Sequence, residues 1–253
     1  RCSKINLREV MHLAIDIGNT AAKLGAFKGE ELLEVAYTNN NTLAALPEVA
    51  KRYPIKSAIY STTVDLSDEA MEKIAQLPFP CLKMTSTTPI PITCAYEQPE
   101  TLGTDRVAAV VGAASIKQGV PMLVIDSGTC ITFEFLDEHG CYQGGNISPG
   151  LEMRLKALNH FTSRLPLVMS TGPMPELGKD TKTAIRLGVK KGLQYEIEGY
   201  IEEFRRKYPN LLVFLTGGDD FSFDTNIKNL IFADRFLVLK GLNRILNYNN
   251  DKK

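Results

Sequence analysis

A short polar turn of similar composition occurs twice in this chain. The first follows the apolar run His12–Ile15 and reads Asp16-Ile-Gly-Asn-Thr20. The second follows Leu123–Ile125 and reads Asp126-Ser-Gly-Thr129, 110 positions later. Each turn leads into a second β-type run, which predicts two antiparallel hairpins with glycine and asparagine in left-handed backbone. The repetition indicates two similar halves, and with mixed strands and helices it predicts an α/β protein with a cleft between two lobes.

Apolar patterning and helix-end residues predict further elements. Strands are expected at Ser57–Tyr60, Leu211–Leu215 and Phe236–Val238. Helices are expected at Thr104–Ser115, Gly150–Asn159, Thr181–Tyr208 and Gly241–Asn247. Thr104 and Pro149 stand where a helix start favours a cap or a first-turn proline.

The longest predicted helix carries one apolar stripe. An apolar residue recurs at every fourth position: Ile185, Val189, Leu193, Ile197 and Ile201. Core packing accounts for such a stripe. Because the stripe exceeds what one lobe needs, we hypothesise that part of it lies at a homodimer interface.

The boundary between the halves is predicted near Gly119–Met122, which gives an N-terminal lobe over 11–119 and a C-terminal lobe over 120–253. Residues Arg1–Val10 precede a methionine and lack an apolar signal core. They are interpreted as a leader or tag, and a short native arm is the alternative.

Composition and missing motifs exclude several classes of function. The 253 residues are 44% hydrophobic and carry 29 basic and 29 acidic side chains. This balance does not favour a nucleic-acid or membrane partner, and no apolar run approaches the ~20 residues of a membrane span. Five cysteines without a C-x-x-C pair predict reduced thiols in the cytoplasm. The chain has no P-loop, dinucleotide-binding or nucleophile-elbow motif.

The two aspartate turns are candidate phosphate sites. A glycine turn with Asp16, Thr20 and nearby Lys23 offers N–H donors, a hydroxyl, a carboxylate for Mg²⁺ and a positive charge. For one turn alone, a plain polar hairpin is an equal alternative. Two turns that face each other could hold a triphosphate from both sides of a cleft. The segment Thr216-Gly-Gly-Asp219 could let backbone approach a flat ligand, or it is a simple strand-end loop.

Two further segments allow both a structural and a chemical interpretation. Gly103-Thr-Asp-Arg106 opens a helix rich in small residues that should pack closely. Asp105 could simply favour the helix dipole, with Arg106 a solvated surface charge. An aspartate that accepts a hydroxyl proton beside a carboxylate-binding arginine also suits a kinase with an acidic alcohol substrate. Gly144–Gly150 is interpreted as a turn into a helix, with close packing favoured over anion binding.

Six of these motifs, in this order, resemble those of type III pantothenate kinases. They are Asp16-Ile-Gly-Asn-Thr-x-x-Lys23, Gly103-Thr-Asp-Arg106, Asp126-Ser-Gly-Thr129, Gly144-Gly-Asn-Ile-Ser-Pro-Gly150, Thr181-x-x-Ala-Ile-x-x-Gly188 and Thr216-Gly-Gly-Asp219. The resemblance implies the actin/Hsp70/sugar-kinase architecture with two RNase H-like lobes. It also implies ATP-dependent phosphorylation of the pantothenate hydroxyl, the entry step of coenzyme A synthesis. The alternatives are an ATP-binding regulatory protein of the same fold without kinase activity, and a sugar or acetate kinase.

The resemblance also implies roles for individual residues. The first phosphate loop of the ATP site would comprise Asp16, Ile17, Gly18, Asn19, Thr20, Ala21, Ala22 and Lys23, and Thr129 would touch an ATP phosphate. Asp105 would be the general base. The pantothenate site would comprise Tyr96, Gly103, Thr104, Asp105, Arg106 and Thr181, the last reaching across a homodimer interface. Asp126 would bind K⁺ or NH₄⁺, and ATP would enter with Mg²⁺.

Overall fold

The computed structural model describes residues 10–218 and 231–252, which form two compact units. The first unit holds the described residues up to Gln118, Gly140–Gln143 and those from Phe236 on; the second holds Gly119–His139 and Gly144–Arg235. The predicted leader, apart from Val10, and Asp219 lie outside the described residues. The division into lobes 11–119 and 120–253 stays a prediction. No helix among the described residues has the length and apolar character needed to cross a membrane.

The first unit is built on a five-stranded mixed sheet in the order β3-β2-β1-β4-β5. Its strands are β1 (Met11–Ile17), β2 (Ala22–Lys28), β3 (Glu31–Thr38), β4 (Ile55–Thr62) and β5 (Cys81–Lys83). β1 pairs antiparallel with β2 and parallel with β4. Alternate residues of β1, among them Leu13 and Ile15, face one hydrophobic core, so His12 and Asp16 face the other side of the sheet.

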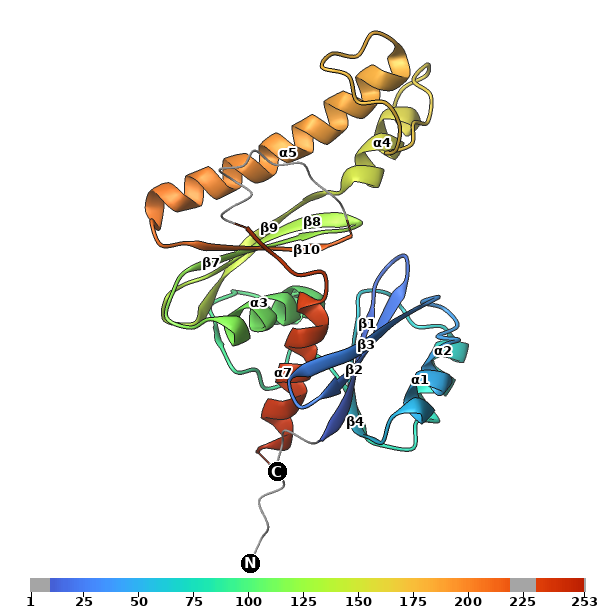
Figure 1. The fold of residues 1–253 in the computed structure, drawn as a ribbon, viewed down its shortest axis with the longest axis vertical. Helices are drawn as coiled ribbons and strands as arrows, with labels where there is room; N and C mark the ends of the chain where they lie inside the picture. The colour runs from blue at the N-terminus through green and yellow to red at the C-terminus, as the bar shows by residue number, and fades with distance from the viewer. Residues whose placement is uncertain (1–9, 219–230, 253) are drawn as a thin grey trace, which may run out of the picture. The chain divides into compact units, whose positions relative to one another are not determined.

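Helices cover both faces of this sheet (Figure 1). On one face lie α1 (Leu46–Arg52) and α2 (Asp68–Ala75), and on the other lie α3 (Thr104–Ile116) and α7 (Leu237–Asn250). Two glycines let α3 and α7 approach closely. A Cβ on Gly112 would lie 2.3 Å from the Leu237 carbonyl oxygen, and one on Gly241 would lie 1.7 Å from that of Ala108. The close packing predicted for the small-residue helix is confirmed.

The second unit contains a mixed sheet in the order β11-β10-β7-β8-β9, with two helices along one face (Figure 1). The strands are β7 (Met122–Ser127), β8 (Cys130–Leu136), β9 (Cys141–Pro149), β10 (Leu212–Gly217) and β11 (Ile231–Ala233). The helices are α4 (Leu151–His160) and α5 (Thr181–Lys207). In the first unit, β6 (Thr93–Cys94) pairs with the first residues of β9, and a 3₁₀ turn, η2, spans Pro99–Thr101.

The predicted hairpins, the strands in β4 and β10 and the helices α3, α4 and α5 are confirmed. The predicted strand Phe236–Val238 is wrong, because α7 begins at Leu237 and continues through the predicted helix Gly241–Asn247. Leu242, Ile245 and Leu246 extend its buried face at helical spacing. The predicted turn over Gly144–Gly150 is also wrong, since β9 continues to Pro149.

Helix α3 starts at Thr104 as predicted, and α4 starts one residue later than predicted, but both caps differ from the expected positions. The cap of α3 is Gly103, so Thr104 is the first helical residue. The cap of α4 is Gly150, so Pro149 precedes the helix and ends β9.

The apolar stripe of α5 is buried in the core of its own unit. Each of its five residues is at most 8% exposed, and they pack with Leu151, Leu155 and Phe133. The stripe therefore belongs to the core, and the hypothesis that it marks a dimer interface loses its basis.

Candidate functional site

A carboxylate and an ammonium lie side by side where β1 and β2 approach the first turn. Asp16 and Lys23 are directly opposite in the antiparallel register, with Lys23 Nζ 3.9 Å from Asp16 Oδ2. Burial raises the pKa of Asp16 to about 6; Lys23 opposes this rise, and the charge of Asp105 adds to it. The fold thus brings two acidic side chains together from β1 and from the start of α3.

The turn after Asp16 is closed by its own backbone. The Gly18 N–H donates to the Ala21 carbonyl oxygen at 3.1 Å. Contrary to prediction, neither Gly18 nor Asn19 has a positive φ. A Cβ on Gly18 would come no closer than 3.5 Å to its nearest neighbour, so torsion and packing do not require glycine there. Residues 19–21 are exposed, which leaves this side of the loop open to a ligand.

A residue that no sequence motif marked contacts the same turn. Asn40 is 8% exposed, and its Nδ2 donates to the carbonyl oxygens of Gly18 at 3.0 Å and Asn19 at 2.9 Å. It follows β3 in a segment without a motif, so nothing in the sequence pointed to it.

A hydrogen bond connects the start of α3 to the sheet beside Asp16. Thr104 Oγ1 lies 2.7 Å from Ser61 Oγ, and Ser61 pairs with Asp16 in the parallel register of β4 and β1. Ser61 is 1% exposed. This second unmarked residue lies one position beyond the predicted strand Ser57–Tyr60, and it fixes the helix start next to the acidic pair.

Asp105 folds back over the cap of its helix. A Cβ on Gly103 would lie 2.5 Å from Asp105 Oδ1, so the carboxylate occupies the space that a side chain at position 103 would need. Asp105 itself is half-buried.

Arg106 and Tyr96 lie close together in the first unit. The Arg106 guanidinium carbon lies 5.7 Å from the centre of the Tyr96 ring. Tyr96 in turn stacks on the buried Tyr142, with ring centres 6.3 Å apart and planes 6° apart. Because Arg106 is only 7% exposed, its interpretation as a solvated surface charge is wrong. A buried guanidinium beside an aromatic face is typical of a recognition site.

In the second unit, glycine backbone packs against the Asp126 turn. Asp126 lies between Thr132 of β8 and Thr216 of β10 in the sheet register. Gly217 has a φ of +103°, and a Cβ there would lie 2.0 Å from the Ser127 carbonyl oxygen. The Gly218 N–H donates to the same oxygen at 2.9 Å. The close approach that Gly217 allows is therefore to the turn itself.

Two glycines of the 144–150 segment pack closely, one against the turn at Gly128 and Thr129 and one against β8. The Gly150 N–H donates to the Thr129 carbonyl oxygen at 3.1 Å. A Cβ on Gly150 would lie 2.1 Å from the carbonyl oxygen of Gly128. A Cβ on Gly145 would lie 2.1 Å from the Phe133 carbonyl oxygen. The favoured interpretation of this segment, close packing, is confirmed.

Thr181 is the exposed first residue of α5. The Asp180 side chain caps the helix, accepting from the Lys182 and Thr183 N–H groups. Within the described residues, the Thr181 side chain makes no hydrogen bond to other predicted site residues.

The described residues contain no cluster of three or more His, Cys, Asp or Glu side chains that could hold a metal ion. A cation at Asp16 or Asp126 would therefore complete its coordination with water and ligand oxygens, as Mg²⁺ commonly does beside phosphates. Burial is the main cause of the raised pKa of Asp16, and a bound cation would favour the charged form of this carboxylate.

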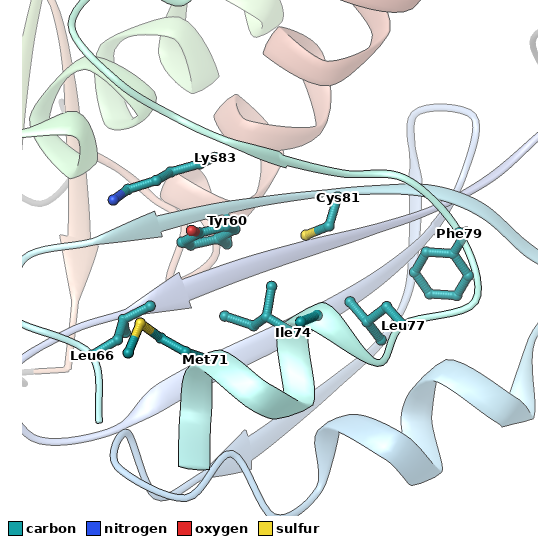
Figure 2. Close-up of a pocket in the computed structure, with 9 residues that line it drawn as sticks. Tyr60, Leu66, Met71, Ile74, Leu77, Phe79, Cys81 and Lys83 are labelled. Atoms are coloured by element: carbon teal, nitrogen blue, oxygen red, sulfur yellow. The ribbon is translucent and has the colours of Figure 1, made fainter. Parts of the chain in front are cut away.

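A separate pocket of about 400 Å³ lies between α2 and the β4–β5 edge (Figure 2). Apolar side chains, among them Leu66, Ile74 and Phe79, make up most of its wall, with Tyr60 and Lys83 on the strands. Burial raises the pKa of the Cys81 thiol in this wall to about 12, which keeps it protonated and unreactive. None of the predicted site residues lines this pocket.

Comparison with known proteins agrees with the motifs. Residues 12–203 match the family model of type III pantothenate kinase. A type III pantothenate kinase of Bacteroides fragilis ATCC 25285 is 59% identical over 242 residues, covering 96% of this chain and all of the relative. The Cytophaga hutchinsonii type III pantothenate kinase is 43% identical, covering 94% of this chain and all of the relative.

Solved structures support the architecture. A conserved Campylobacter jejuni protein, proposed as a Baf family transcriptional activator, aligns with a TM-score of 0.60 and 21% identity, over 94% of this chain and 99% of its own. A proposed N-acetylmannosamine kinase from Listeria monocytogenes aligns with a TM-score of 0.56 and 13% identity, over 96% of this chain and all of its own. At these identities the likeness is one of fold, that of the actin-like ATPases predicted from the sequence.

Proposed function

The chain belongs to the type III pantothenate kinase family, and from that premise we propose which of its residues carry the reaction. It is an ATP-dependent kinase that phosphorylates pantothenate in coenzyme A biosynthesis. The observation that carries the proposal is the convergence of Asp16, Ser61, Thr104 and Asp105 at one edge of the first sheet. The cleft predicted between the lobes stays a prediction.

Asp105 is the proposed general base. Its carboxylate takes the proton of the pantothenate hydroxyl as that oxygen bonds to the γ-phosphorus, while the bond from the γ-phosphorus to the bridging oxygen breaks and ADP leaves. Two observations support this role. The Thr104–Ser61 hydrogen bond fixes the helix start, and Gly103 leaves the space in which the carboxylate lies.

Residues 16–23 are the proposed first phosphate loop. Backbone N–H groups of the exposed turn, the Thr20 hydroxyl and the Lys23 ammonium supply donors and positive charge to the phosphates. Ile17, Ala21 and Ala22 contribute backbone only. Asp16 would hold Mg²⁺ or its waters, and Mg²⁺, when bound, neutralises phosphate charge. Thr129, in the second unit, is the proposed further contact to an ATP phosphate.

Pantothenate is a carboxylate with amide and hydroxyl groups, and Arg106 is its proposed anchor. A guanidinium binds a carboxylate with two parallel hydrogen bonds, and Tyr96 is positioned against that guanidinium. Gly103 and Thr104 would contribute the edge of the site.

Thr181 is the proposed contact from a second copy of the chain in a homodimer. A dimer mass in light scattering at micromolar concentration tests this, and a monomer mass contradicts it.

Asp126 is the proposed site of a monovalent cation, K⁺ or NH₄⁺, whose charge would stabilise the crowded phosphates.

We also propose that the enzyme works in the cytoplasm, where thiols stay reduced. The four described cysteines (Cys81, Cys94, Cys130 and Cys141) are all free, which agrees with this.

Coupled detection of ADP release, with and without pantothenate, tests the site assignment. The unmodified chain should release ADP only when pantothenate is present. Arg106→Lys should raise KM for pantothenate and leave KM for ATP unchanged, because a lysine cannot form the paired hydrogen bonds. An equal rise of both KM values would remove Arg106 from the pantothenate site.

A further inference from the structure

We propose that Asn40 is a positioning residue for the phosphate loop, which turns the N–H groups of Asn19 and Thr20 toward the phosphates of ATP. The inference rests on the proposed function of residues 16–23. Asn40 is buried and belongs to none of the motifs. Its Nδ2 donates to two successive carbonyl oxygens of the loop, those of Gly18 and Asn19.

The geometry follows from the planarity of the peptide bond. In a trans peptide, the carbonyl of one residue and the N–H of the next point in opposite directions. Because Asn40 holds the Gly18 and Asn19 carbonyls on its own side, the N–H groups of Asn19 and Thr20 point to the opposite side. One amide group thereby sets the direction of two backbone donors.

Those two donors are available to a ligand. Within the described residues, neither the Asn19 N–H nor the Thr20 N–H donates a hydrogen bond, and both residues are exposed. Successive N–H groups on one side of a loop form a concave anion-binding arrangement. The Gly18 N–H is already used within the turn, because it donates to the Ala21 carbonyl. The two donors left for a ligand are therefore the N–H groups of Asn19 and Thr20, which belong to the two peptide groups that Asn40 contacts.

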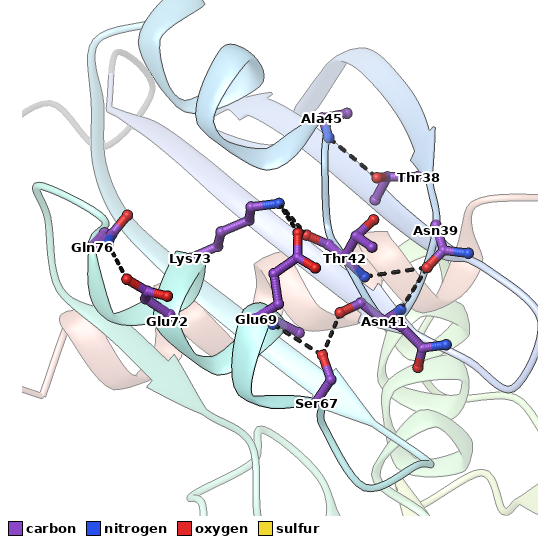
Figure 3. A network of polar contacts seen from close by, with 11 residues as sticks. Thr38, Asn39, Asn41, Thr42, Ala45, Ser67, Glu69, Glu72, Lys73 and Gln76 are labelled. Atoms are coloured by element: carbon purple, nitrogen blue, oxygen red, sulfur yellow. Dashed lines mark hydrogen bonds and ion pairs between the residues drawn. The ribbon is translucent and has the colours of Figure 1, made fainter.

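Asn40 lies in the connection between β3 and α1, where hydrogen bonds join the neighbouring residues (Figure 3). The Asn39 Oδ1 accepts from the N–H groups of Asn41 at 2.9 Å and Thr42 at 3.2 Å, and the Asn39 carbonyl accepts from the Leu43 N–H at 2.9 Å. Leu43 has a φ of +44°, a conformation that costs a branched residue ~1 kcal/mol or more. Its complete burial in the core holds it there.

Helix α2 supports the same connection from its other side (Figure 3). Lys73 Nζ donates to the Thr42 carbonyl at 2.6 Å, and the Ser67 hydroxyl donates to the Asn41 carbonyl. Both neighbours of Asn40 in sequence are therefore fixed. Hydrogen bonds on both sides of Asn40 in the sequence thus support the position from which its amide contacts the loop, as a positioning residue requires.

The test replaces the amide donor and measures each substrate separately. In Asn40→Asp the side chain keeps its size but has no N–H donor, and in Asn40→Ala both hydrogen bonds are lost. We expect Kd for a non-hydrolysable ATP analogue, measured by titration calorimetry, to rise about tenfold in both variants, which corresponds to two hydrogen bonds of ~0.5–1 kcal/mol each. KM for pantothenate should stay within about twofold, and circular dichroism should show a folded protein.

The matched control is Asn249→Asp. Asn249 Nδ2 also donates to two backbone carbonyls, those of Pro89 and Ile245, both at 2.8 Å, but it lies outside the phosphate loop. The Asn249→Asp variant should leave Kd for the ATP analogue unchanged. An equal rise of Kd in this control, or an equal rise of KM for pantothenate in the Asn40 variants, would mean that Asn40 only stabilises the fold, and would overturn the inference.

A loop variant separates this inference from the proposed function. Asp16→Asn should weaken binding of the Mg²⁺–ATP analogue if residues 16–23 hold the phosphates. If Asp16→Asn weakens binding and the Asn40 variants do not, the positioning role is wrong while the phosphate loop stands. If none of these variants changes Kd, the phosphate-loop assignment fails, and the role of Asn40 fails with it.

Discussion

The space beside Gly103 is filled by the carboxylate of Asp105. A methyl group at position 103 would lie 2.5 Å from Asp105 Oδ1, well inside van der Waals contact. The backbone at Gly103 has a φ of −56°, which any residue adopts. The constraint is therefore on the carboxylate, since backbone torsion does not demand glycine here.

Gly103→Ala should consequently act on catalysis more than on stability. The alanine methyl group would push the Asp105 carboxylate away, and displacement of a reacting group by ~1 Å can cost about 10²-fold in rate. We expect kcat to fall at least about tenfold while the melting temperature changes little. Steady-state kinetics and a thermal melt measure the two effects.

Gly199→Ala is the control for this substitution. Gly199 lies on α5, and nothing lies within 4 Å of the position that an alanine methyl group would take there. That variant should keep full activity. If Gly103→Ala also keeps full activity, the Asp105 carboxylate is not confined by its helix cap in the working enzyme.

Asp105→Asn tests the base directly. An amide of the same shape cannot accept the hydroxyl proton, so kcat should fall roughly 10²–10⁴-fold. Binding of an ATP analogue should persist, because the phosphate contacts are proposed to come from other residues. Near-normal turnover in this variant would remove Asp105 from the role of general base.

The sequence was most informative where chemistry and local structure coincide. The Asp16 and Asp126 turns stand between strong β-type runs, so their hairpins could be predicted from local pattern alone. The start of α3 could be predicted equally well, because a helix rich in small residues follows Gly103 directly. That this helix packs closely also followed from its composition, although its partner α7 did not.

The parts that escaped prediction depend on contacts distant in sequence. Asn40 and Ser61 are single polar residues whose partners lie 21 to 43 positions away, and no local pattern marks such a residue. The segment after Phe236 looked like a strand because its apolar residues are consecutive. It forms α7 because both its faces meet apolar neighbours, α3 on one side and the sheet on the other, where tertiary packing overrides short-range propensity.

His12 should make stability depend on pH. It lies in β1 at 2% exposure, and burial lowers its pKa, although the side chains of Asn243 and Asn247 and the charge of Asp251 oppose this. The folded state therefore favours neutral His12. Its contribution to stability is present above the unfolded value of ~6.5 and is lost as pH falls below that value toward the lowered folded pKa.

Thermal melts at pH 7.5 and pH 5.5 measure this dependence. From pH 7.5 to pH 5.5, the melting temperature of the unmodified protein should fall more than that of His12→Gln, because the glutamine side chain does not titrate. His139→Gln should behave like the unmodified protein, because the His139 side chain is 83% exposed. Parallel melting curves for all three proteins would show that His12 does not titrate differently in the folded state.

The cation assigned to Asp126 can be tested by ion replacement. With K⁺ exchanged for Na⁺ at constant ionic strength, we expect turnover to fall at least about tenfold, since loss of one charge-stabilising group at a reacting centre commonly costs 10²–10³-fold. Asp126→Asn should have low activity that no longer depends on which cation is present. Asp137→Asn is the matched control, because this carboxylate accepts from the His139 N–H in a turn outside the proposed site, and the variant should keep the preference for K⁺. A K⁺ preference that survives in Asp126→Asn would place the cation elsewhere.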